Sequence, residues 1–207
     1  MPSYKLTYFD VRGLVEPARQ LFHLAGIKFE DKRLNHEEFA KFKSKTPFGF
    51  LPVLSVDGFE IPESAAIGRY LARKFGFAGK TPEEEAWVDA IVDQFKDFMV
   101  AFRSLAQAKM AKKSVDEIEK ITKEVFTPAK DQYFKTLNGI LEKSKSGFLV
   151  GDKLTWADLV VVDNLVTLEK MSFFSAKKHP KLAALKKKVH GSPNLKDYIA
   201  NRPDTEF

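Results

Sequence analysis

The sequence predicts a two-domain protein, with an α/β domain over residues 1–80 and an all-helical domain over residues 81–207. Alternating, β-prone segments occur only before Thr81-Pro82, whereas long stretches with a helical spacing of apolar residues follow it. A chain of 207 residues is long enough for two domains, each with a core of its own.

The chain opens with a strand, a helix and a second strand. Residues 4–9 alternate in hydrophobicity, Glu16-Pro17 begins a helix that Gly26 ends, and residues 28–34 are again β-prone. Because a strand–helix–strand unit crosses over in a right-handed sense, we expect the two strands to be parallel neighbours.

A short helix and a hairpin follow. Asn35-His36-Glu37 begins a helix that ends near Lys45, and Asp57-Gly58 is a strong two-residue turn signal between residues 52–56 and 59–61. These two strands are therefore expected to be antiparallel.

Ser64 is the expected N-cap of the last helix of this domain, which ends before Gly76. The resulting order, β-α-β-α-β-β-α, is typical of a thioredoxin-like α/β domain. In the second domain, Thr155 and Asp158 form a capping-box pattern at a helix start. The helices expected there cover residues 82–110, 115–145, 155–170, 180–190 and 194–200.

The chain has no cysteine, which excludes disulfides, thiolate metal sites and a thiol nucleophile of its own. Thioredoxin-like domains normally carry a Cys-x-x-Cys pair after the first strand, and this chain has Tyr8–Gly13 there instead. Any thiol chemistry must therefore use a thiol that a ligand brings in.

Charge and motif patterns exclude several other classes. The net charge is +6, and the local run of lysines over residues 177–188 has no interleaved aromatic residues, so it indicates a solvated helix face more than a nucleic-acid site. The histidines show no metal-ligand spacing, and no phosphate-binding loop or serine-hydrolase motif occurs. We expect no bound metal. The four histidines are His23, His36, His179 and His190.

The first ten residues lack a basic segment followed by an apolar one, and the longest apolar run covers only residues 98–102. With no cysteines as well, a cytoplasmic location without membrane insertion is expected.

Three local features could form a ligand site at the carboxyl ends of the strands, where ligands gather in open α/β sheets. Tyr8 ends the first strand, although it could equally be a core or rim tyrosine. Pro52 begins a strand, and a cis bond after Leu51 is expected from the fold although most X-Pro bonds are trans. Glu63 and Ser64 start a helix, where they could hold an amino-acid end or form an ordinary cap.

Apolar residues recur at helical spacing in the first helix of the second domain. This stripe is typical of a core, but the chain has 19 phenylalanines, so some could line a pocket between the domains. The stripe consists of Ile91, Phe95, Phe98, Met99 and Phe102.

Five sequence blocks together resemble the cytosolic glutathione transferases, most closely the sigma class with its nematode members. They occur in the family's order and span essentially the whole chain. The blocks are YKLTYFDVRGLVEPAR, TPFGFLPVLSVDG, IPESAAIGRYLARKFGFAGK, VDAIVDQFKDFM and FLVGDKLTWADL.

The resemblance implies glutathione as co-substrate and assigns a role to each matching position. Tyr8 matches the catalytic tyrosine, whose hydroxyl donates a hydrogen bond to the glutathione sulfur. Lys43 matches a residue that binds the glycine carboxylate. Leu51 matches the residue whose backbone pairs with the cysteinyl unit. Glu63 and Ser64 match the pair that holds the γ-glutamyl end.

The resemblance also implies a homodimer, in which Asp97 reaches the γ-glutamyl end from the partner subunit. Gly49 belongs to the implied glutathione-binding set. Phe39 replaces a tryptophan that donates to the glycine carboxylate, and Phe50 replaces an assisting Lys or Gln, so glutathione binding should be weakened modestly. Leu14 replaces an arginine of mammalian sigma members, which puts prostaglandin isomerisation in doubt.

The function implied is conjugation of glutathione to small hydrophobic electrophiles, as in detoxification. The expected electrophile pocket consists of Phe9, Leu14, Met99 and Phe102. Alternatives are glutathione-dependent prostaglandin isomerisation or peroxide reduction, and a non-catalytic protein that carries haem or another apolar ligand or serves a crystallin-like role.

Overall fold

The structure is a computed structural model that describes residues 2–205. Its N-terminal part contains a four-stranded sheet in the order β2-β1-β3-β4. Strand β1 (Tyr4–Phe9) pairs in parallel with β2 (Glu30–Leu34) and antiparallel with β3 (Val53–Val56), which pairs antiparallel with β4 (Phe59–Pro62). The predicted parallel pair and antiparallel hairpin are confirmed.

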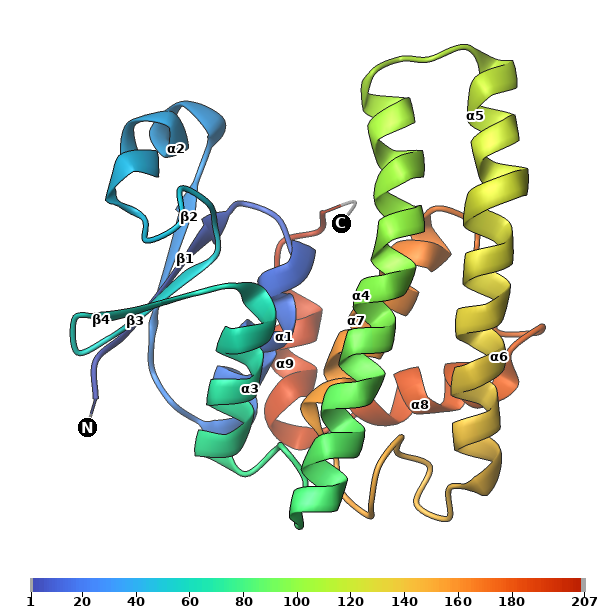
Figure 1. Cartoon of the computed structure of the whole chain (residues 1–207). Helices are drawn as coiled ribbons and strands as arrows, with labels where there is room; N and C mark the ends of the chain where they lie inside the picture. Colours follow the sequence, from blue (N-terminus) through green and yellow to red (C-terminus); the bar gives the residue numbers. More distant parts are fainter. Residues whose placement is uncertain (1, 206–207) are drawn as a thin grey trace.

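The helices of this domain are α1 (Glu16–Ala25), α2 (His36–Phe42) and α3 (Ser64–Phe75). Figure 1 shows α1 and α3 between the sheet and the helical domain, with α2 farther out beyond the end of β2. Leu6 of β1 lies opposite Leu54 of β3, and both side chains are fully buried. One short turn that the sequence did not predict, the 3₁₀ helix Gly13–Val15, precedes α1.

The second part is all-helical, as predicted. The long helix α4 stands beside the rod formed by α5 and α6, and α7 runs through the interior with buried residues on all sides (Figure 1). The helices are α4 (Pro82–Met110), α5 (Val115–Ile121), α6 (Thr127–Lys143), α7 (Trp156–Lys170), α8 (Pro180–His190) and α9 (Pro193–Asn201).

The single helix expected over residues 115–145 is divided by a π-helical turn, Thr122–Phe126. The N–H of Thr127 donates to the carbonyl of Thr122, five residues back. The wider turn comes directly before Pro128, which has no N–H to donate and whose ring would clash with an ordinary preceding turn.

Two helix starts were predicted from the sequence: the prediction for α7 is confirmed, and the one for α3 is wrong by one residue. Asp158 accepts hydrogen bonds from the N–H of Thr155 at 2.8 Å and from the N–H of Leu149 at 2.9 Å, which confirms the capping box. The predicted N-cap at Ser64 is wrong by one residue, because the first intrahelical bond runs from the Ile67 N–H to the Glu63 carbonyl. Glu63 is thus the N-cap.

The two parts of the chain pack tightly through α3 and α7. A β-carbon added at Gly68 of α3 would lie 2.6 Å from the ring of Trp156, and the backbone N–H of Trp156 donates to the Phe77 carbonyl at 3.0 Å. Trp156 is 2% exposed, so the absence of a side chain at Gly68 is what admits its ring. Within residues 2–205, no helix has the length and apolar character needed to cross a membrane.

Candidate active site

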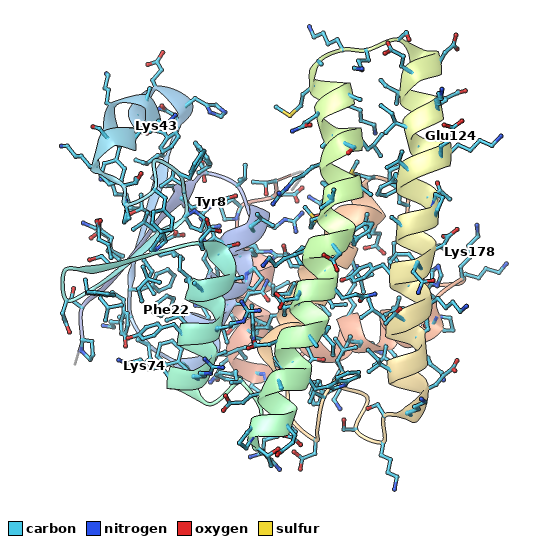
Figure 2. The ribbon with its side chains drawn as sticks, viewed as in Figure 1. Tyr8, Phe22, Lys43, Lys74, Glu124 and Lys178 are labelled. Carbon is cyan, nitrogen blue, oxygen red and sulfur yellow. The ribbon has the colours of Figure 1, made fainter. Side chains whose placement is uncertain are left out.

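A cleft of about 560 Å³ lies between the N-terminal domain and helices α4 and α7. Figure 2 shows Tyr8 on the side of the N-terminal domain that faces α4. Nine of the residues predicted for the site line this cleft, so the structure brings together positions far apart in the sequence. They are Tyr8, Leu14, Phe50, Leu51, Pro52, Glu63, Ser64, Met99 and Phe102.

Tyr8 is held by a close approach of the backbone. It lies on β1 opposite Arg33, and its ring is pressed against the turn that contains Gly13. A β-carbon at Gly13 would lie 2.8 Å from the Tyr8 ring and 2.9 Å from its hydroxyl oxygen. Gly13 also has φ +50°, a conformation that glycine adopts without strain. Only glycine therefore fits beside Tyr8.

The surroundings of Tyr8 keep its hydroxyl protonated. Burial raises the pKa of the Tyr8 phenol, against the smaller lowering effects of a backbone hydrogen bond from Leu14 and of the charges of Arg19 and Arg103. A phenol with a raised pKa remains a hydrogen-bond donor at neutral pH. Tyr8 can therefore donate a hydrogen bond to an anion in the cleft.

Two backbone features complete this wall of the cleft. The Leu51-Pro52 peptide bond is cis, as the fold led us to expect. Glu63 has φ +71°, unusual for a residue with a side chain, and it positions Ser64 as the first residue of α3. The first amides of a helix and a serine hydroxyl suit a carboxylate, and the neighbouring Glu63 carboxylate suits an ammonium.

Three predicted glutathione residues meet at the rim. The Lys43 ammonium lies 5.9 Å from the centre of the Phe50 ring, and a β-carbon at Gly49 would lie 3.7 Å from Lys43 Cε. Phe50 is 67% exposed and lines the cleft, whereas Lys43 and Gly49 lie just outside its lining. Figure 2 shows Lys43 at the outer end of the domain, near α2.

Three other predicted residues lie off the cleft. Phe9 ends β1, and its ring packs edge-on against the Tyr8 ring at a centroid distance of 5.6 Å and lies 5.2 Å from the rings of Phe39 and His36, outside the cleft lining. Phe39 also lies outside the lining. Asp97 is exposed on α4 and is not part of the lining.

A buried charge network lies below the cleft and joins the two domains. Arg12 pairs with Asp163 of α7 at 2.9 Å, and Arg202 pairs with Asp163 at 3.1 Å and with Glu16 of α1 at 2.7 Å. The Tyr198 hydroxyl donates to Glu16 at 2.9 Å. Since Arg12 and Glu16 flank the turn at Gly13, these ion pairs hold the turn that supports Tyr8.

Comparison with known proteins identifies the family. The family model for the glutathione S-transferase N-terminal domain matches residues 4–73, and the model for the C-terminal domain matches residues 96–202. The chain belongs to the glutathione S-transferase family. Among curated relatives, glutathione S-transferase 4 of Caenorhabditis elegans is 49% identical over 205 residues, covering 99% of both chains.

Solved structures of nematode transferases share the fold over nearly the whole chain. A glutathione S-transferase of Caenorhabditis elegans is 57% identical with a TM-score of 0.91, covering 99% of this chain and all of that one. Na-GST-3 of Necator americanus, described as monomeric, is 46% identical with a TM-score of 0.91 and the same coverage. A Nu-class transferase of Haemonchus contortus is 46% identical with a TM-score of 0.90, and the match covers 100% of both chains.

The cleft of this transferase also contains residues that sequence reasoning missed. Arg103 and Asn164 line it, and the buried side-chain oxygen of Asn164 accepts no hydrogen bond from residues 2–205. Arg103 follows Met99 by four residues, so helical spacing alone could have found it. A polar pair inside the otherwise apolar stretch of α7 was the available signal for Asn164. Residues 2–205 contain no cluster of three or more His, Cys, Asp or Glu side chains arranged to hold a metal ion.

Proposed function

We propose that this transferase activates the thiol of glutathione with Tyr8 and conjugates the thiolate to small hydrophobic electrophiles held in the cleft. The observation that carries the proposal is the position of the Tyr8 phenol, which lines the cleft against Gly13 and whose pKa is raised by burial. The reaction also requires a surface that binds the electrophile. The apolar side chains of Leu14, Met99 and Phe102, which line the cleft, provide it.

The energetics of thiol activation are sufficient. A free thiol has a pKa of about 8.5, so only a small fraction is thiolate at neutral pH, and the thiolate is the nucleophile. A hydrogen bond to a charged acceptor is worth about 1.5–3 kcal/mol, and one pKa unit corresponds to about 1.36 kcal/mol. Tyr8 can therefore lower the pKa of the bound thiol by about one to two units.

The rest of glutathione extends along the N-terminal wall in this proposal. The cysteinyl unit pairs with the backbone of Leu51 before Pro52, and the γ-glutamyl end binds Glu63 and Ser64 at the start of α3. Support comes from the cis bond and from the helix start, which both face the cleft.

The glycine carboxylate is assigned to Lys43, beside Gly49 and Phe50 at the rim. Phe39 has no polar hydrogen to donate, so this end of glutathione relies mainly on Lys43 and binds more weakly than it would with an indole at residue 39.

The electrophile pocket is proposed without Phe9, whose ring packs against the rings of Tyr8 and Phe39 and lies outside the cleft lining. Leu14 stands where mammalian sigma members have an arginine, so we propose conjugation in preference to prostaglandin isomerisation.

We further propose a cytoplasmic homodimer of the sigma type, with domains at 1–80 and 81–207, in which Asp97 of one subunit reaches the γ-glutamyl site of the other. Exposed Asp97 on α4 is available for such a contact.

Turnover of chlorodinitrobenzene with glutathione tests the function directly. The proposal predicts saturable conjugation that Tyr8→Phe slows, while Phe59→Tyr, an exposed aromatic change remote from the cleft, leaves the rate intact. Haem binding without any conjugation would instead favour a ligand carrier.

A further inference from the structure

The wall that α4 presents to the cleft is mostly apolar but contains two cations, Lys96 and Arg103. Met99, Arg103, Ala106 and Met110 follow one another at intervals of four, three and four residues, so they share one face of the helix, and all four line the cleft. Arg103 is exposed, while Phe102 beside it is buried. A guanidinium therefore interrupts a surface otherwise suited to an apolar ligand.

Among residues 2–205, no acidic side chain pairs with Arg103. Within residues 2–205 it donates no hydrogen bond and forms no ion pair, unlike Lys96, the other cation of the lining, which pairs with Asp93 at 3.6 Å. The carboxylate of Asp163 is already occupied by two arginines.

The remaining carboxylate of the lining, Glu63, lies at the start of α3 in the opposite wall, where the proposed function assigns it to the amino group of glutathione. The charge of Arg103 is felt inside the cleft, since it lowers the pKa of the Tyr8 phenol, although burial has the larger and opposite effect.

An electrophile that covers this wall must remove water from Arg103. Desolvating a guanidinium without a partner is costly, whereas a carboxylate can replace the lost water with two charge-assisted hydrogen bonds. A neutral apolar electrophile desolvates the guanidinium without replacing the lost hydrogen bonds. The wall should therefore bind an electrophile with a carboxylate more strongly than a neutral one.

We propose that Arg103 makes the cleft selective for amphipathic electrophiles, with an apolar body, a reactive carbon at one end and a carboxylate at the other. This inference rests on the proposed function and names its substrate class. The acceptors that fit are carboxylic acids bearing an enone. The glutathione thiolate adds to the β-carbon, the C–S bond forms as the C=C π bond breaks, and the α-carbon takes up one proton from solvent.

The experiment uses a matched pair of acceptors, para-acryloylphenoxyacetic acid and its methyl ester. Both carry the same enone, which is separated from the acid or ester by a para-phenylene ring and an oxymethylene group. The reaction of each with free glutathione provides the uncatalysed reference. The quantity measured is the acid-to-ester ratio of kcat/KM, divided by the uncatalysed ratio.

We expect the intact protein to prefer the acid by about fivefold, the upper end for an ion pair at an exposed site. Arg103→Gln should bring the preference to about one, and Arg103→Lys should keep part of it because the charge remains. Lys109→Gln is the matched control, since Lys109 is on α4 but lies over the Phe173 ring and outside the lining. It should leave the preference unchanged.

The possible failures are separable. Equal loss with acid and ester in Arg103→Gln would mean that Arg103 acts on the thiolate and would overturn the inference, as would an intact protein with no preference. An intact protein that turns over neither acceptor would instead contradict the proposed function. Because Arg103 is exposed and forms no ion pair with the described residues, 2–205, its variants should melt at the same temperature as the parent, which circular dichroism checks.

Discussion

A β-carbon at Gly13 would lie 2.8 Å from the ring of Tyr8, so the position of this proposed catalytic residue depends on a neighbour without a side chain. Gly13→Ala must push the phenol or the turn away. Since small misplacements of reacting groups are costly, we expect kcat/KM to fall by about tenfold to a hundredfold.

The control is Gly26→Ala. Gly26 has φ +67° but nothing within 4 Å of its β-carbon position, so this variant carries a similar backbone cost of about 1 kcal/mol without the clash. Equal activity losses in the two variants would show that backbone strain, and not contact with Tyr8, is responsible.

Gly68 of α3 has the same relation to Trp156 at the domain junction. Gly68→Ala should lower the free energy of unfolding by about 1–3 kcal/mol, because the added methyl group overlaps a buried ring. Gly139→Ala in α6 meets no atom within 4 Å and should raise it by about 0.5–1 kcal/mol. Urea denaturation measures both, and a loss of stability in the second variant would contradict this account.

His190, at the end of α8, should make the free energy of unfolding decrease at acid pH. Burial, aided by the charges of Arg202 and Lys186, lowers the pKa of His190 to about 4, and its Nε2 atom is buried without a partner in residues 2–205. In the unfolded chain, where a histidine has a pKa of about 6.5, His190 binds a proton as the pH falls below this value, whereas in the folded chain it stays neutral until the pH approaches about 4. This contribution to stability is fully present above about pH 6.5 and is lost as the pH falls toward 4.

We expect His190→Leu to reduce the loss of unfolding free energy between about pH 7 and about pH 5 by about 1 kcal/mol, allowing for the partial exposure of the ring. His36→Leu, at an exposed position on α2, serves as the control. The same pH slope in all three proteins would remove His190 from the explanation.

The proposed homodimer predicts shared active sites. Mixed dimers of Tyr8→Phe and Asp97→Ala subunits should contain one site with both defects and one with neither, so mixing the two impaired proteins should restore part of the activity. Sedimentation provides the prior check. A monomer that binds glutathione fully would rule out the shared site.

Much of the fold could be predicted because its signals are local. The Asp57-Gly58 hairpin and the capping box of Thr155 and Asp158 depend on residues a few positions apart, and both are present. The cis bond at Pro52 was predicted from the fold that these signals indicate.

What the sequence did not reveal depends on contacts between distant segments. Gly13 matters only because the turn folds against Tyr8, and the domain junction at Gly68 depends on a ring 88 positions farther along the chain, at residue 156. Phe9 was assigned to the pocket from the family resemblance, but its ring packs against Tyr8, Phe39 and His36 outside the cleft lining. Phe39 and His36 belong to α2, a separate segment of the chain, so no local pattern reveals this packing.

The pKa of the glutathione thiol, titrated through its thiolate absorbance in the bound state, tests the central claim most directly. With intact Tyr8 the bound thiol should titrate about one to two units below the free thiol, and in Tyr8→Phe it should return toward about 8.5, with glutathione affinity nearly unchanged. Coincident titration curves for the two proteins, together with full activity of Tyr8→Phe, would contradict the account.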